Sequence, residues 1–131
     1  MEENKDISIL YVEDDPSLAK LFEKLLTSLN YKVDLSYDGA DAIEKIKAKY
    51  YHIILLDLML PKYSGTEVLY AINKEGLKYG KVIILTNLAW DEFAQKTKEN
   101  YGVQDYLVKS NYQPQQVAEI IQKRLMELQS S

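Results

Sequence analysis

Five short runs rich in β-branched and other apolar residues alternate along the chain with segments that show helical spacing of apolar residues. These runs cover residues 8–12, 32–36, 53–57, 81–86 and 105–108. Strands that alternate with helices indicate βαβ units, and such units build a parallel sheet. The sequence therefore predicts an α/β fold with a five-stranded parallel sheet and five helices.

Local signals mark where several of these helices begin. Proline suits the first turn of a helix, and Pro16 and Pro114 open the first and the last helical segment. Ser64, with Glu67 three positions later, is typical of a capping box, and Asp91 is a candidate N-cap. These signals agree with the apolar spacing, so the helix starts are predicted from two independent patterns.

Length and composition limit the possible functions. A chain of 131 residues without a break in composition fits one domain over residues 1–131, with the last helix running nearly to the end. Sixteen basic and twenty acidic residues give a net charge of −4, so neither nucleic acid nor an anionic membrane is an expected partner. The sequence shows no signal-peptide pattern and no apolar stretch of membrane-spanning length, which predicts a cytoplasmic protein.

The missing residue types also restrict the chemistry. The chain has no cysteine, which excludes thiol catalysis and thiolate metal sites, and His52 is its sole histidine, which excludes a multi-histidine metal site. Carboxylate, hydroxyl and amine groups therefore remain to carry out any chemistry of this chain.

Three carboxylates stand where predicted strands end. Glu13 and Asp14 follow the first strand, and Asp57 closes the third. If these strands are neighbours in a parallel sheet, the three acids converge at its carboxyl edge, where open α/β folds bind ligands. Crowded carboxylates repel one another, so a bound divalent cation is expected. Any single acid is also explained as a helix cap or turn former, but the three together are less easily explained that way.

A hydroxyl and an amine complete this group, because Thr86 ends the fourth strand and Lys109 follows the fifth. Singly, the threonine reflects β-propensity and the lysine is a solvated charge. Together, a hydroxyl, an ammonium and a carboxylate-held cation around Asp57 can bind the three oxygens of a phosphoryl group. The pattern favours Asp57 as a nucleophile in phosphoryl transfer.

With these residues in this order, the chain resembles the receiver domain of two-component response regulators. The matching segments are 9–15, 55–61, Gly65, 83–86 and 105–109. Each segment alone is weak evidence for this family. Five segments in the family's order and at similar intervals are specific evidence, and together they cover essentially the whole chain. The resemblance implies a doubly wound, flavodoxin-like sheet with strand order 2-1-3-4-5.

The resemblance also implies roles for the acidic residues. Asp57 is then the phosphoacceptor and a Mg²⁺ ligand, Asp14 is a direct ligand and Glu13 acts through water. Met59 offers its backbone carbonyl to the metal. This set suits Mg²⁺, which prefers a few carboxylates together with water and phosphate oxygen.

Residues on the other side of Asp57 follow from the same resemblance. Thr86, Asn87 and Lys109 are the expected phosphate-binding residues, and Tyr106 is the aromatic that moves inward when Thr86 is drawn to the phosphate. Asn87 and Ser110 depart from the family, which usually has a small residue and a proline there. Because a non-proline cis bond costs about 2.5 to 4 kcal/mol, the sequence leaves open whether Lys109–Ser110 is cis.

The resemblance implies a phosphoacceptor signalling domain that takes its phosphoryl group from a histidine kinase or histidine phosphotransfer protein. Such a domain catalyses only its own phosphorylation and dephosphorylation. Its phosphorylated form is recognised by an unknown protein partner. A constitutive scaffold with the same fold is one alternative. A flavodoxin-like ligand-binding module is another, but residues 13–16 are acidic and lack the glycine of a phosphate-binding loop. An aspartate-nucleophile phosphatase ordinarily has an acid two residues after the nucleophile, where this chain has Met59.

Overall fold

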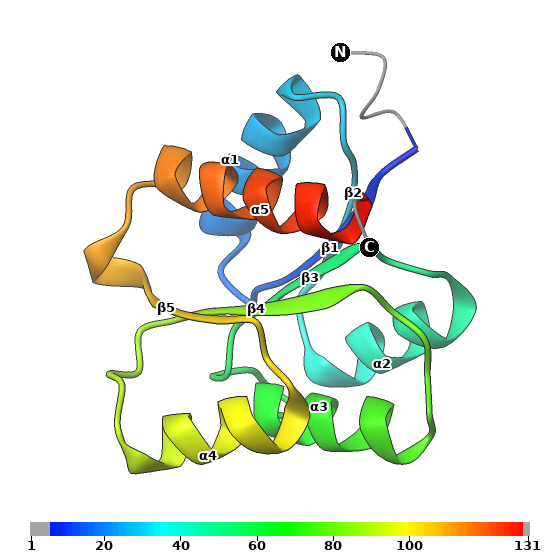
Figure 1. Ribbon diagram of the computed structural model, residues 1–131, viewed down its shortest axis with the longest axis vertical. Helices are drawn as coiled ribbons and strands as arrows, with labels where there is room; N and C mark the ends of the chain where they lie inside the picture. The colour runs from blue at the N-terminus through cyan, green and yellow to red at the C-terminus, as the bar shows by residue number, and fades with distance from the viewer. Residues whose placement is uncertain (1–5, 130–131) are drawn as a thin grey trace.

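The computed structural model describes residues 6–129 as a five-stranded parallel sheet between two layers of helices (Figure 1). The strands are β1 (Ser8–Val12), β2 (Lys32–Ser36), β3 (Ile53–Leu56), β4 (Lys81–Thr86) and β5 (Asp105–Val108). The helices are α1 (Pro16–Ser28), α2 (Gly39–Ala48), α3 (Gly65–Lys74), α4 (Glu92–Tyr101) and α5 (Pro114–Gln129). The strand order is β2-β1-β3-β4-β5, which confirms the predicted architecture.

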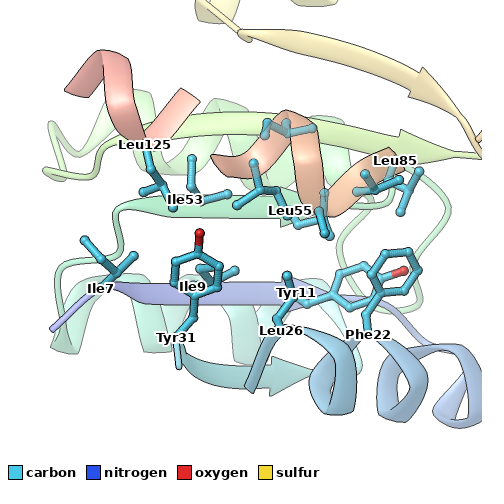
Figure 2. Packing of buried hydrophobic residues seen from close by; sticks show 14 of the residues in the cluster. Ile7, Ile9, Tyr11, Phe22, Leu26, Tyr31, Ile53, Leu55, Leu85 and Leu125 are labelled. Carbon is cyan, nitrogen blue, oxygen red and sulfur yellow. The ribbon is translucent and has the colours of Figure 1, made fainter. Parts of the chain in front are cut away.

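The sheet has an apolar core on each face. Helices α1 and α5 cover one face, and α2, α3 and α4 cover the other (Figure 1). Successive side chains of a strand point to opposite faces, so Tyr11 of β1 packs with α1 and α5 while Leu10 packs toward α2 and α3. Figure 2 shows the first core, in which the rings of Tyr11 and Phe22 meet edge to face at 5.2 Å. Within residues 6–129, no helix combines the length and apolar character needed to cross a membrane.

The predicted helix starts are confirmed. The Asp15 side chain accepts hydrogen bonds from the first turn of α1, next to Pro16. Ser64 and Glu67 form a reciprocal capping box at α3, and the Asp91 carboxylate accepts from the backbone N–H of Ala94 in α4. Each such cap contributes about 1 kcal/mol, and each fixes the angle at which the chain leaves the sheet edge.

Three local features differ from the sequence expectation or go beyond it. Strand β3 ends at Leu56, so Asp57 is the first residue of a loop. A 3₁₀ turn, η2 (Lys109–Asn111), follows β5 and is closed by a hydrogen bond from the N–H of Tyr112 to the carbonyl of Lys109 at 3.3 Å. The Lys109–Ser110 peptide is trans.

Candidate functional site: a carboxylate cluster bridged by a lysine

The structure brings the three predicted acids together at the carboxyl edge of the sheet. Strands β1 and β3 are paired in register, Val12 opposite Leu56, so the residues that follow them are neighbours. One carboxylate oxygen from each of Glu13, Asp14 and Asp57 lies within 4.8 Å of the other two. Oxygen ligands of this kind are those that Mg²⁺ prefers.

The three acids differ in burial. Glu13 and Asp57 are 1% and 4% exposed, whereas Asp14 is exposed. The Glu13 N–H donates to the carbonyl of Ser36 in β2, and the Asp57 N–H donates to the carbonyl of Val12 in β1. The backbone of both buried acids is therefore held by a neighbouring strand, while Asp14 leaves one side of the cluster open to water. An open side suits Mg²⁺, which keeps several water ligands.

Lys109 bridges the two buried acids. Its Nζ donates to Glu13 Oε1 at 2.6 Å and to Asp57 Oδ2 at 2.9 Å. Burial by itself would lower the pKa of Lys109, but the hydrogen bonds with Glu13 and Asp57 outweigh it and hold the pKa above its ordinary value. One ammonium therefore faces three carboxylates, and the site keeps an excess of negative charge that a divalent cation would neutralise.

Tyr11 is part of the site and was not anticipated from the sequence. Its hydroxyl donates to Glu13 Oε1 at 3.1 Å, and the N–H of Asp15 donates to Glu13 Oε2 at 3.1 Å. Burial and the charge of Glu13 raise the pKa of Tyr11, so the hydroxyl stays a donor. The available signal was the spacing: Tyr11 lies two residues before Glu13, which places both on one side of the strand.

The loop that carries Asp57 is held by short backbone contacts. The Met59 N–H donates to Asp57 Oδ1 at 3.1 Å, while the Met59 side chain is 54% exposed. The Gly65 N–H donates to the carbonyl of Leu58 at 2.9 Å. A Cβ on Gly65 would lie 2.4 Å from the carbonyl oxygen of Asp57, so only glycine allows α3 to approach this closely.

A second hydrogen-bonded group lies on the other side of Asp57. Thr86 is fully buried, and its Oγ1 accepts from the Leu88 N–H at 3.4 Å. The Tyr106 hydroxyl donates to the Leu88 carbonyl at 3.0 Å, and the ring of Trp90 meets that of Tyr106 edge to face at 5.2 Å. Asn87 is exposed between these residues. Leu88 is thus attached through its backbone to both Thr86 and Tyr106.

The sequence matches known proteins over most of its length. Residues 9–122 match the family described as the response regulator receiver domain. The response regulator ArlR of Staphylococcus aureus is 41% identical over 101 residues, which are 77% of this chain and 45% of that protein. The chain therefore spans less than half the length of this relative.

Solved structures with the same fold support the family match. The response regulator receiver domain protein (CheY-like) from Methanospirillum hungatei JF-1 superposes with a TM-score of 0.84 at 26% identity, covering 95% of this chain and 97% of that one. The BeF3-activated N-terminal receiver domain of RstA from Klebsiella pneumoniae gives 0.78 at 28% identity, covering 90% and 97%. Family match and shared fold lead to one conclusion: the chain belongs to the response regulator receiver domain family.

Proposed function

We propose that this chain is a phosphoacceptor signalling domain in which Asp57 receives a phosphoryl group from the phosphohistidine of a histidine kinase or histidine phosphotransfer protein. The observation that carries the proposal is the position of Lys109, whose ammonium bridges Asp57 and Glu13 beside the open carboxylate of Asp14. A nucleophile, a cationic group and a set of metal-binding oxygens therefore lie at one point. Family membership supports the same function, because receiver domains of response regulators interact with histidine kinases.

The proposed metal is Mg²⁺, held by Glu13, Asp14 and Asp57 with the backbone carbonyl of Met59. Bound there, the ion supplies positive charge that offsets repulsion between the acids and an incoming phosphoryl group. Asp57 offers a carboxylate oxygen to phosphorus, the bond from phosphorus to the donor nitrogen breaks, and a bond from phosphorus to the aspartyl oxygen forms. Lys109 and the hydroxyl of Thr86 bind the phosphoryl oxygens, with Asn87 beside them.

The proposed switch acts through Thr86. The phosphoryl group on Asp57 carries about −1.5 to −2 charges, in place of the single charge of the free carboxylate. The Thr86 hydroxyl then leaves the N–H of Leu88 for a phosphoryl oxygen, and the ring of Tyr106 moves into the space it vacates. Because Leu88 is bonded to both residues, the start of α4 and the end of β5 change together and present an altered surface to a protein partner.

We also propose that residues 1–131 form one domain that acts in the cytoplasm, without direct contact to nucleic acid or membrane. This domain catalyses no reaction beyond its own phosphorylation and dephosphorylation. The partner read by the switched surface is a protein. A scaffold with this fold would not need phosphate, and the presence of every acidic and phosphate-binding residue of the family in this chain argues against it.

The test is the intact mass after incubation with acetyl phosphate and Mg²⁺. We expect the parent chain to gain one phosphate, and Asp57→Asn or the parent with a chelator to gain none. The Asn side chain has nearly the same shape, so it controls for a disturbed fold. An unmodified parent chain, or an Asp57→Asn variant that is modified to the same extent, would overturn the proposal.

A further inference from the structure

One cavity of the described chain lies away from the carboxylate cluster. Helices α2 and α3 cover the same face of the sheet (Figure 1), and a groove with a volume of about 630 Å³ lies between them. Tyr101, at the end of α4, also lines it. This volume falls in the range of about 300 to 1,000 Å³ typical of small-molecule sites. None of the residues assigned to phosphoryl transfer or metal binding lines the groove.

The groove has aromatic walls. Tyr63, Tyr70 and Tyr101 line it together with the small or aliphatic side chains of Ala40 and Ile43. The exposed fractions of Tyr63 and Tyr70 are 47% and 55%, so both rings are accessible to a ligand. The face of an aromatic ring attracts a cation.

A cation already lies over one of these rings. The Nζ of Lys74 is 5.7 Å from the ring centroid of Tyr70, within the range of a cation–π contact. The ring therefore favours positive charge in its surroundings.

The charges around the groove favour the same kind of ligand. Glu44, Glu67 and Glu75 line it, and Lys47 is the only basic residue among the lining residues. The Nζ of Lys47 lies 3.4 Å from a carboxylate oxygen of Glu44 and 3.5 Å from one of Glu75. Such long, exposed ion pairs are weak, so the flexible lysine can move aside. Carboxylates outnumber the ammonium among the lining residues, so the groove carries an excess of negative charge.

One wall of the groove is held by close backbone packing. A Cβ on Gly39 would lie 1.9 Å from the carbonyl oxygen of Tyr63, and the Gly39 N–H donates to the carbonyl of Pro61 at 3.3 Å. The start of α2 is therefore fixed against the segment that carries Tyr63. A wall that is already in place lowers the cost of ordering side chains around a ligand.

We propose that this groove binds a small organic cation, that is, an ammonium group attached to an apolar or aromatic body. The body packs against Ile43 and the ring of Tyr70, and the ammonium lies near Glu44 and Glu75, in place of the Lys47 ammonium. An anion would meet three carboxylates, and a neutral molecule with the same body would lack the ion pairs.

The binding test uses the full chain labelled with ¹⁵N and three probes that share a benzyl group. Benzyltrimethylammonium is expected to shift amide signals of α2 and α3 in a saturable way, and phenylmethanesulfonate and benzyl alcohol are expected to bind more weakly. Equal binding of the three probes, or shifts confined to other elements, would overturn the proposal. The titration also works on the Asp57→Asn chain, so its outcome is independent of phosphorylation.

Variants locate the site. Glu44→Gln with Glu75→Gln is expected to weaken binding of benzyltrimethylammonium about threefold or more. Tyr70→Leu, at an exposed position, is expected to weaken it about two- to fivefold, and Tyr70→Phe keeps the ring and the affinity. Glu92→Gln with Glu119→Gln removes the same charge from α4 and α5 and is expected to leave binding unchanged. Parental affinity in the Glu44→Gln, Glu75→Gln variant and in Tyr70→Leu, or an equal loss in the control pair, would refute the site.

Discussion

Lys109 is the residue on which both the stability and the chemistry of the carboxylate cluster depend. Its ammonium compensates Glu13 and Asp57, which are almost fully buried. Removing one partner of a buried ion pair costs about 3 to 5 kcal/mol, because the remaining charge is left without compensation. Lys109→Met is therefore expected to lose about this much free energy of unfolding in urea at pH 7 without metal.

The matched control for that change is Lys20→Met. Lys20 also pairs with an acid, Glu23, but on the surface of α1 with an N–O distance of 3.4 Å. An exposed pair of this kind contributes less than about 1 kcal/mol. A loss in Lys109→Met no greater than in Lys20→Met would show that the buried pair is not stabilising the fold.

Asp14 is the acid of the cluster that Lys109 does not bridge, and it is exposed. Replacing it with the neutral, similarly shaped asparagine removes repulsion from Glu13 and Asp57 and leaves the lysine bridge in place. We expect Asp14→Asn to raise the free energy of unfolding of the metal-free chain by up to about 1 kcal/mol, and to lose phosphorylation. Thermal unfolding with a chelator present measures the first effect. Asp6→Asn, before β1, is the control, and an Asp14→Asn chain that melts no higher than the parent would contradict the repulsion.

Met59 and Leu88 lie two residues after Asp57 and Thr86, and we expect their side chains to govern the lifetime of the phosphorylated state. Both side chains are exposed, at 54% and 40%. Hydrolysis needs a water molecule oriented in line with the bond to phosphorus, and neither a thioether nor an isobutyl group orients water by strong hydrogen bonds. We expect slow phosphate release from the purified phosphoprotein and faster release from a Met59→Asn, Leu88→Glu double variant. Equal rates would mean that these side chains do not set the lifetime.

At the scale of elements, the segment between β4 and α4 is where we expect the response to phosphorylation. Leu88 is bonded through its N–H to Thr86 and through its carbonyl to Tyr106, and Trp90 packs on the Tyr106 ring. Phosphorylation is therefore expected to change amide exchange in this segment, at the start of α4 and in β5, and to shift the fluorescence of Trp90. Residues 42–49 of α2 are expected to stay unchanged.

The control for this response is Thr86→Ala, which keeps the phosphoacceptor but lacks the hydroxyl that changes partners. The variant should still gain phosphate, while its Trp90 fluorescence and the exchange of its β4–α4 segment stay close to those of the unphosphorylated chain. A full response in Thr86→Ala, or a response centred on α2, would refute the proposed route.

The sequence predicted the elements well because their signals are local. The alternation of apolar runs, the capping box at Ser64 and the N-cap at Asp91 depend on neighbours a few residues away, and the structure confirms them. The 3₁₀ turn after β5 was not predicted, because it depends on a single backbone bond from Tyr112 to Lys109.

The site was predicted only in part, for the same physical reason. The topology of a parallel sheet explains why Glu13, Asp14 and Asp57 meet, and this follows from strand ends alone. The bridge from Lys109 to both buried acids depends on how its side chain reaches across the sheet, which periodicity does not specify. The two-residue spacing places Tyr11 and Glu13 on one side of the strand, but it does not specify a hydrogen bond between them.

For the molecule as a whole, several groups resist losing a proton in the folded state. Those with raised pKa values include four tyrosines and one buried lysine: Tyr11, Tyr31, Tyr51, Tyr106 and Lys109. Burial is the main cause for the tyrosines, and for Lys109 the hydrogen bonds to its two acids outweigh burial. A raised pKa in the folded state stabilises the protein fully below the unfolded pKa, and this contribution is lost as the pH rises through the folded pKa.

The free energy of unfolding is therefore expected to fall steeply above about pH 10, near the unfolded pKa of tyrosine and lysine. Each proton contributes at most about 1.4 kcal/mol per pH unit to the slope. Urea unfolding at a series of pH values measures how the free energy of unfolding changes with pH. Tyr51→Phe removes one group, whose hydroxyl donates to Asp34 at 2.6 Å, and is expected to flatten the slope by up to that amount. The same slope in the variant and the parent would contradict this cause.

The bond between Lys109 and Glu13 joins residues that are 96 positions apart, and it closes across the sheet from the last strand to the first. A loop of this length forms late, because its closure entropy must be met before the contact contributes. A chain still leaving the ribosome, with β5 not yet synthesised, has the acids of the cluster but no ammonium between them. The contact therefore forms only after β5 has been made and has paired with the sheet, and a chain that ends before Lys109 lacks the ammonium of the site.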